Sequence, residues 1–209
     1  MLITGFDAFG GDAINPSWLV AKALHGRVIL GHKVTAAQLP TVFDVSVLAL
    51  RTLLKQHRPA LVICVGQAGG RTALSLERVA INVNDARIAD NAGSQPVDTP
   101  VMPGAPAAYF STLPIKAMLL ALQREGIPAE VSQTAGTFVC NHVFYGLMHL
   151  LATERGFKRS RGGFIHVPWL PEQGNPCMPL ADIARGLELA VQTALSSRTD
   201  AVAGAGALD

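Results

Sequence analysis

The chain has 209 residues, 49% of them hydrophobic and 15% charged, and its 17 basic and 15 acidic side chains give a formal net charge of +2. That length can bury a core without disulfides, and so small a net charge disfavours nucleic-acid or anionic-membrane partners. No stretch approaches the roughly 18 apolar residues of a membrane-spanning helix and the amino terminus lacks a secretory signal, so we expect a cytoplasmic protein.

The first third of the chain alternates apolar strands with helices. Asn15 and Pro16 have the character of an N-cap and a first helical residue, and the continuous apolar run over 60–65 is typical of a strand buried on both faces. In chain order, the expected elements are a strand over 2–4, a helix from 16, strands over 28–30 and 33–39, a helix over 42–53 and a strand over 60–65.

The rest of the chain continues the alternation. The expected elements are an extended segment over 74–84, a loop over 85–106, a helix over 114–124, a strand over 129–133, a helix over 138–152, a strand over 163–167 and a helix over 179–197. Such alternation predicts a three-layer α/β/α sandwich with a largely parallel, twisted mixed sheet. We expect one catalytic domain over 1–197, followed by a flexible tail over 198–209.

Two glycine-containing loops follow predicted strands, at 5–11 and 66–71. Neither has the glycine order of a dinucleotide-binding loop or the lysine of a P-loop. The carboxyl ends of strands are nevertheless where α/β proteins place substrate sites. The loops therefore locate a site without identifying its ligand.

Cys140 lies at the predicted start of a helix, whose unpaired amides and partial positive charge lower the pKa of a thiol. This position suits a nucleophile, although a small core residue is the plainer interpretation. Cys64 and Cys177 are expected to be structural residues. An odd number of cysteines without a CxxC pair predicts free thiols and no thiolate zinc site.

A nucleophilic cysteine needs an imidazole and a group that orients the imidazole. His166 ends the last core strand and should reach the edge where the loops gather. Glu77 shares strand parity with Val79 and so lies on an apolar face, where it needs a partner. His166 and Arg78 are both possible partners, and a structural ion pair is as compatible with the pattern as a triad.

Five segments of the chain together resemble the pyroglutamyl-peptidase I (pyrrolidone-carboxylate peptidase) family. They are GFDAFGG at 5–11 with NPS at 15–17, GQAG at 66–69 with LSLERVAIN at 74–82, DARIADN at 85–91, AGTFVCN at 135–141 and FIHVP at 164–168. The resemblance implies that Cys140 is the nucleophile, His166 the general acid and base, and Glu77 the orienting carboxylate. It also implies removal of amino-terminal pyroglutamyl residues from peptides, no metal or other cofactor, and a homotetramer.

The resemblance also implies a binding pocket. Arg87 and the Cys140 amide would bind the oxyanion, and the implied substrate contacts are Phe6, Phe9, Asn15, Gln67, Phe138 and Val139. A pyroglutamyl group is a flat, uncharged lactam, which suits apolar faces with a few amide partners. Ala8 stands where the family commonly has proline, a departure that bears on affinity more than on chemistry.

Two other function classes stay open. Strand-end glycine loops in an α/β domain are compatible with a nucleoside phosphorylase-like enzyme, which would need phosphate and not Cys140. A binding module without catalytic activity would keep the pocket and lack turnover.

Overall fold

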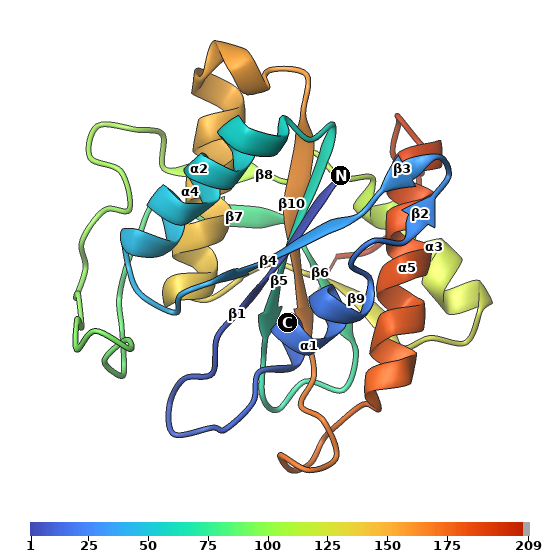
Figure 1. Cartoon of the computed structure of the whole chain (residues 1–209), viewed down its shortest axis with the longest axis horizontal. Helices are drawn as coiled ribbons and strands as arrows, with labels where there is room; N and C mark the ends of the chain where they lie inside the picture. The colour runs from blue at the N-terminus through green and yellow to red at the C-terminus, as the bar shows by residue number, and fades with distance from the viewer. Residues whose placement is uncertain (207–209) are drawn as a thin grey trace.

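A central six-stranded sheet organises the computed structural model, which describes residues 1–206 (Figure 1). In spatial order its strands are β4 (Thr35–Leu39), β1 (Leu2–Phe6), β5 (Leu61–Gln67), β10 (Arg161–Val167), β6 (Leu74–Glu77) and β9 (Ala129–Ser132). The first four strands are mutually parallel, β6 is antiparallel to β10, and β9 is parallel to β6. The largely parallel mixed sheet predicted from the sequence is confirmed.

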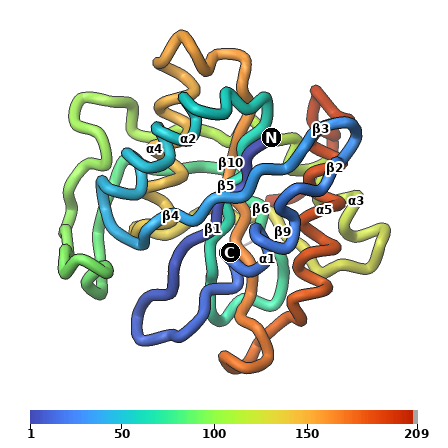
Figure 2. Tube along the Cα trace, viewed as in Figure 1, coloured from blue at the N-terminus to red at the C-terminus, as the bar shows by residue number. Residues whose placement is uncertain are grey.

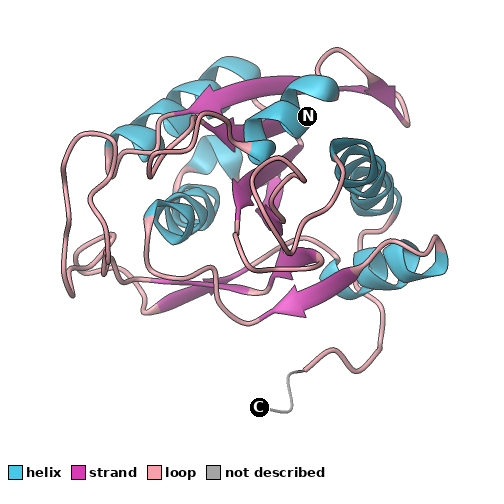
Figure 3. Ribbon diagram, turned by 90° about the horizontal axis from the view of Figure 1, so that it is seen from below, coloured by secondary structure: helices cyan, strands magenta, loops and turns pink. Residues whose placement is uncertain are grey.

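Helices cover both faces of the sheet (Figure 3). One face carries α2 (Val45–His57) and α4 (Val139–Thr153), and the other carries α1 (Pro16–Ala23), α3 (Ile115–Arg124) and α5 (Leu180–Ser196). Two hairpins, β2 (Val28–Ile29) with β3 (His32–Lys33) and β7 (Val79–Ile81) with β8 (Ala108–Phe110), form separate small sheets. None of the helices over residues 1–206 has the length and apolar character needed to cross a membrane.

β5 explains why this sheet needs two helical layers. All seven of its residues are buried; Val62 and Cys64 contribute to the core under α2 and α4, while Ile63 and Val65 contribute to the core under α1, α3 and α5. Successive side chains of a strand point to opposite faces, so a continuous apolar run requires cover on both sides.

The carboxyl ends of β1, β5 and β10 lie at one edge of the sheet, and the loops that follow them gather there (Figure 1). The long segment 82–107 between β7 and β8 extends beyond the helices that cover the sheet (Figure 2). The carboxyl edge therefore brings together segments that are far apart in sequence, including the glycine-containing loops 5–11 and 66–71.

The extended segment expected over 74–84 is broken at Arg78. β6 ends at Glu77 in the main sheet, and β7 begins at Val79 in a different sheet. Glu77 is buried as predicted. Its burial does not follow from strand parity with Val79, because the two residues lie in different sheets. Glu77 lies on the α4 side of the main sheet because it alternates with Leu76, which belongs to the opposite core.

Part of the expected tail contacts the domain. Asp200 Oδ1 accepts hydrogen bonds from the Lys116 and Ala117 amides, each at 2.9 Å, which caps α3, a helix without a side-chain cap of its own. Ala205 O accepts a hydrogen bond from Arg78 Nη2 at 3.0 Å. The remainder of the predicted tail, 207–209, lies outside the described residues.

Asn141 fixes the start of α4 against β7. Its Oδ1 accepts a hydrogen bond from Ile81 N at 3.0 Å, and its Nδ2 donates to Ile81 O at 2.9 Å and to Val83 O at 3.0 Å. The side chain is fully buried, so water cannot replace these bonds. The residue next to Cys140 therefore holds the helix start in place.

We predict that Asn141→Ala lowers the free energy of unfolding by about 2–4 kcal/mol, because it removes three hydrogen bonds and leaves buried backbone groups without partners. Equilibrium urea denaturation measures this difference. Gln123→Ala, at an exposed position of α3, is the control and should change stability by less than about 0.5 kcal/mol. Equal stability of the two variants would show that Asn141 does not hold α4 in place.

Candidate functional site

Cys140 is the second residue of α4, whose N-cap is the extended residue Phe138. The turn before it is fixed by two hydrogen bonds, from Asp85 N to Thr137 O at 3.0 Å and from Thr137 Oγ1 to Asp85 O at 2.7 Å. The first amides of a helix have no partner within the helix and carry partial positive charge. The thiol thus lies at the positive end of α4.

Gly66 brings the thiol against the main sheet. A Cβ built on Gly66 would lie 2.8 Å from Cys140 Sγ and 2.7 Å from Phe164 Cζ, so only glycine fits. Gly66 pairs in register with His166 of β10, and paired residues of neighbouring strands point to the same face of a sheet. The sulfur therefore lies over the sheet position next to His166.

The imidazole of His166 is buried and held by Glu77. The distance from His166 Nδ1 to Glu77 Oε1 is 2.8 Å, and the Glu77 side chain is fully buried. Because a carboxylate only accepts hydrogen bonds, Nδ1 carries the proton and Nε2 is left as the basic nitrogen. No hydrogen bond joins the Cys140 thiol to His166 in the described part of the chain, and such bonds often shorten only when substrate binds.

Arg71 neutralises Glu77, a role that the sequence analysis did not identify. Its Nη1 lies 2.8 Å from Glu77 Oε1, and its Nη2 donates to Thr134 O at 3.2 Å. Arg78, the alternative partner considered for Glu77, points instead to the carboxyl-terminal segment. Arg71 is the last residue of the glycine-containing loop 66–71 at the end of β5, and this position was the available signal for it.

Burial dominates the proton equilibria of the Cys140 and His166 side chains. Burial lowers the pKa of His166, Glu77 raises it by hydrogen bond and charge, and Arg71 lowers it. The imidazole is therefore neutral at pH 7. Burial, followed by the charge of Glu77, raises the pKa of the Cys140 thiol to about 12.

The expected lowering of the Cys140 pKa by the helix start is wrong for the resting site. Desolvation and the nearby Glu77 charge raise this pKa and outweigh the opposing charge of Arg71. The site at rest holds an uncharged thiol near an uncharged imidazole, and a proton must move before the sulfur can react.

Aromatic side chains gather around Phe138, two residues before the thiol. Its ring centroid lies 6.0 Å from that of Phe9 and 5.4 Å from that of Phe43, the latter edge-on. Phe9 and Phe138 are both partly exposed, so they can contact a ligand. Phe43, from the segment before α2, is a member of the cluster that the sequence analysis missed, because no motif marks it.

Phe6 and Val139, two other expected pocket residues, are in the core. Phe6 is 2% exposed and packs on Phe164 with 6.3 Å between ring centroids. The Val139 side chain is fully buried. Neither side chain presents a surface to a ligand, and their direct effect is on the packing beneath the site.

Gln67 and Asn15 are held by other loops at the same edge. Gln67 Nε2 donates to Asp12 Oδ2 at 2.9 Å, and Gln67 Oε1 accepts from Gln173 Nε2 at 3.2 Å. Asn15 Oδ1 accepts from Ser17 N at 3.1 Å as the N-cap of α1. The sequence did not identify Asp12 and Gln173 as partners of Gln67, because the three residues are far apart in the chain.

Arg87 is exposed and borders a cavity of about 340 Å³ beside the start of α4. The cavity is also lined by Asp85, Ile88, Gly136, Thr137 and Phe138. Arg87 thus adjoins Phe138 across this cavity and is not packed against the thiol. Within residues 1–206, no cluster of three His, Cys, Asp or Glu side chains could hold a metal ion.

Comparisons with known proteins agree on one family. The family model described as pyroglutamyl peptidase matches residues 1–197. A pyrrolidone-carboxylate peptidase of Bacillus thuringiensis is 56% identical over 97% of this chain and 95% of its own. The crystal structure of the pyroglutamyl peptidase I from Bacillus amyloliquefaciens superposes with a TM-score of 0.95 at 48% identity, covering 97% of this chain and 98% of its own. A mutant pyrrolidone carboxyl peptidase from Pyrococcus furiosus has a TM-score of 0.90 at 42% identity, covering 93% and 97%.

We predict that two substitutions move the pKa of His166 in opposite directions. Arg71→Met removes a charge that lowers this pKa, so the pKa rises; Glu77→Gln removes the partner that raises it, so the pKa falls. Titration of the imidazole by NMR, with the signal assigned through His166→Asn, measures both shifts. Arg124→Met, at an exposed position of α3, is the control that should leave the His166 pKa unchanged. Shifts in one common direction would contradict the assigned electrostatics.

Proposed function

The chain belongs to the pyroglutamyl peptidase family, cysteine hydrolases that act on peptide bonds, and on that premise we propose that Cys140, His166 and Glu77 form its catalytic triad. The bond hydrolysed is the amide that follows an amino-terminal pyroglutamyl residue. The observation that carries the proposal is the 2.8 Å contact between His166 Nδ1 and Glu77 Oε1, buried beside the thiol.

The first half of the reaction forms a thioester. Because the resting thiol keeps its proton, His166 Nε2 takes that proton as the sulfur attacks the pyroglutamyl carbonyl carbon. Glu77 stabilises the imidazolium that forms. His166 then donates the proton to the nitrogen of the leaving amine as the C–N bond breaks.

The second half releases pyroglutamate. His166, neutral again, takes a proton from water while the water oxygen attacks the thioester carbon. The C–S bond breaks, and the proton returns to the Cys140 sulfur. Every proton thus passes through one nitrogen, Nε2, because Nδ1 is held by Glu77.

The tetrahedral intermediates carry negative charge on oxygen. The backbone amide of Cys140, in the first turn of α4, is the proposed donor from the main chain. Arg87 is the second proposed donor and would reach the oxygen from the neighbouring cavity. Removing one such donor typically lowers kcat about 100-fold to 1000-fold.

The lactam ring of the substrate suits the surfaces beside the thiol. Phe9 and Phe138 provide apolar faces, with the buried Phe43 packed against Phe138, and Gln67 is the proposed polar partner of the lactam amide. With one contact each to Asp12 and Gln173, Gln67 keeps an N–H and an oxygen lone pair for the ring. Asn15 shapes the first loop by capping α1.

We further propose that the enzyme is cytoplasmic and assembles as a homo-oligomer, a tetramer by family resemblance. The three cysteines are unpaired, as a reducing compartment maintains them. Exposed apolar side chains on the segment 82–107 and on β8 suit a subunit contact: Ile88 is 46%, Val97 62% and Phe110 68% exposed. Sedimentation velocity should give a tetramer that dissociates on Phe110→Asp, and a monomeric wild type would refute the assembly.

We predict that Cys140→Ala and Cys140→Ser each lower kcat/KM for a fluorogenic pyroglutamyl amide by at least about 1000-fold, because the acyl acceptor is lost. Cys177→Ser, a partly exposed cysteine, is the matched control and should retain activity.

Three other results would each reject the proposal. Unchanged hydrolysis in Cys140→Ser would exclude the nucleophile. Hydrolysis that is absent from freshly reduced wild type, with binding of pyroglutamate retained, would favour a binding module. Turnover that requires phosphate and not Cys140 would favour the nucleoside phosphorylase-like alternative.

A further inference from the structure

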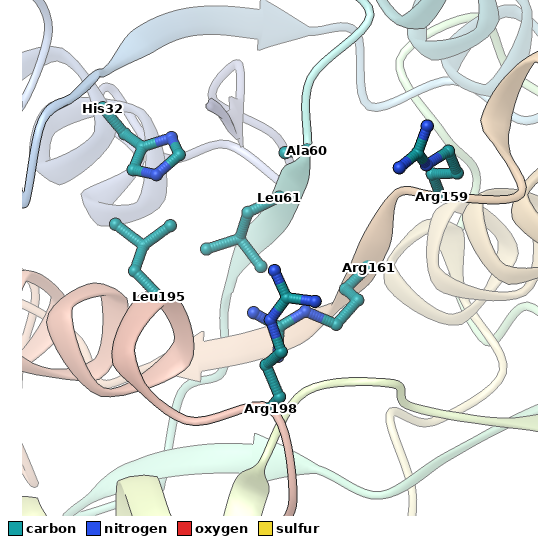
Figure 4. Close-up of a pocket in the computed structure, with 7 residues that line it drawn as sticks. All are labelled: His32, Ala60, Leu61, Arg159, Arg161, Leu195 and Arg198. Atoms are coloured by element: carbon teal, nitrogen blue, oxygen red, sulfur yellow. The ribbon is translucent and has the colours of Figure 1, made fainter.

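A second cavity, of about 490 Å³, lies at the amino edge of the sheet, where β5 and β10 begin (Figure 4). It is lined by His32, Ala60, Leu61, Arg159, Arg161, Leu195 and Arg198. The catalytic residues lie at the opposite edge. Leu61 and Gly66 are five residues apart on β5, which puts the cavity about 17 Å from the thiol site. The peptidase reaction therefore leaves it unexplained.

Within residues 1–206, the three arginines of this cavity have no acidic partner. In the part of the chain that the structure describes, no carboxylate forms an ion pair with Arg159, Arg161 or Arg198; the arginines in ion pairs are Arg27, Arg51 and Arg71. The whole chain carries a net charge of only +2. The unpaired arginines thus reflect a local separation of charge and not a generally basic protein.

Arg161 is held rigidly at the wall of the cavity. Its Nη1 donates to Ser197 O at 2.8 Å and its Nη2 to Ala194 O at 2.5 Å, at the end of α5. A guanidinium has five N–H groups, so donors remain free after these two bonds. Capping α5 explains why Arg161 is present, but it does not explain why Arg198 lies close to it.

Arg161 and Arg198 place like charges together. Figure 4 draws their guanidinium groups next to each other, and burial, followed by the charge of Arg198, lowers the pKa of Arg161. Arg198 is exposed and could turn to solvent. An anion between the two groups would remove the repulsion and use the free donors, since a guanidinium matches phosphate with paired hydrogen bonds.

We propose that this cavity binds a small phosphate-bearing molecule, anchored by Arg161 and Arg198 and flanked by Arg159. Its volume lies in the range of about 300–1000 Å³ typical of small-molecule sites. Leu61 and Leu195 offer apolar surface to the part of the ligand that bears no charge.

Isothermal titration with pyrophosphate at constant ionic strength tests the proposal. We expect saturable one-site binding to the wild type, at least 10-fold weaker binding to Arg198→Ala, and no measurable binding to the Arg159→Ala/Arg198→Ala double variant. Arg161 is left intact because it also caps α5. Arg124→Ala, which removes one charge from an exposed position of α3, is the matched control and should bind like the wild type.

Hydrolysis of a pyroglutamyl amide verifies that each arginine variant is folded and should be unchanged, since none of these residues is in the catalytic site. The absence of saturable binding to wild type would overturn the proposal, as would equal weakening by Arg124→Ala. Binding of the protein to phosphatidylglycerol vesicles is the second measurement. Vesicle binding that needs Arg198, without pyrophosphate binding, would replace the small molecule with a membrane surface and so refute the site as proposed.

Discussion

One buried carboxylate oxygen holds the candidate site together. Glu77 Oε1 contacts both His166 Nδ1 and Arg71 Nη1, each at 2.8 Å, in a side chain with no exposed surface. A carboxylate without partners at that position would cost several kcal/mol. The two contacts stabilise it, and one of them also fixes the tautomer that leaves His166 Nε2 basic. The contact between Glu77 and His166 thus stabilises the buried carboxylate and also leaves His166 Nε2 as the basic nitrogen.

The fold brings this pair to the thiol through close packing. β6 runs antiparallel to β10 with Ser75 paired to His166, so Glu77, two residues later, lies on the same face of the sheet as the imidazole. Gly66 allows α4 to approach so closely that any larger residue would collide with Cys140 Sγ, and Asn141 ties the helix start to β7. Partial burial of the thiol between these elements, together with the charge of Glu77, raises its pKa although the helix start favours its charge.

Much of this arrangement could be predicted from the sequence. The apolar run of β5 and the alternation of strands with helices indicated the layers, and strand-end positions indicated the edge where His166 lies. Long-range contacts could not be predicted. Arg71 and Phe43 enter the site through packing between distant segments, and the break at Arg78 is decided by the pairing of β7 with β8. The Cys140 pKa was misjudged because a helix start is visible in sequence whereas desolvation is not.

We propose that His166, oriented by Glu77, acts on an uncharged Cys140 thiol. Thiolate absorbance near 240 nm, taken as the difference between wild type and Cys140→Ala across a pH titration, tests this proposal most directly. With the Cys140 pKa raised to about 12, we predict no thiolate signal from the free enzyme between about pH 6 and about pH 9. A full thiolate signal at about pH 7 would instead mean that a thiolate–imidazolium pair exists before substrate binds, and it would contradict the account.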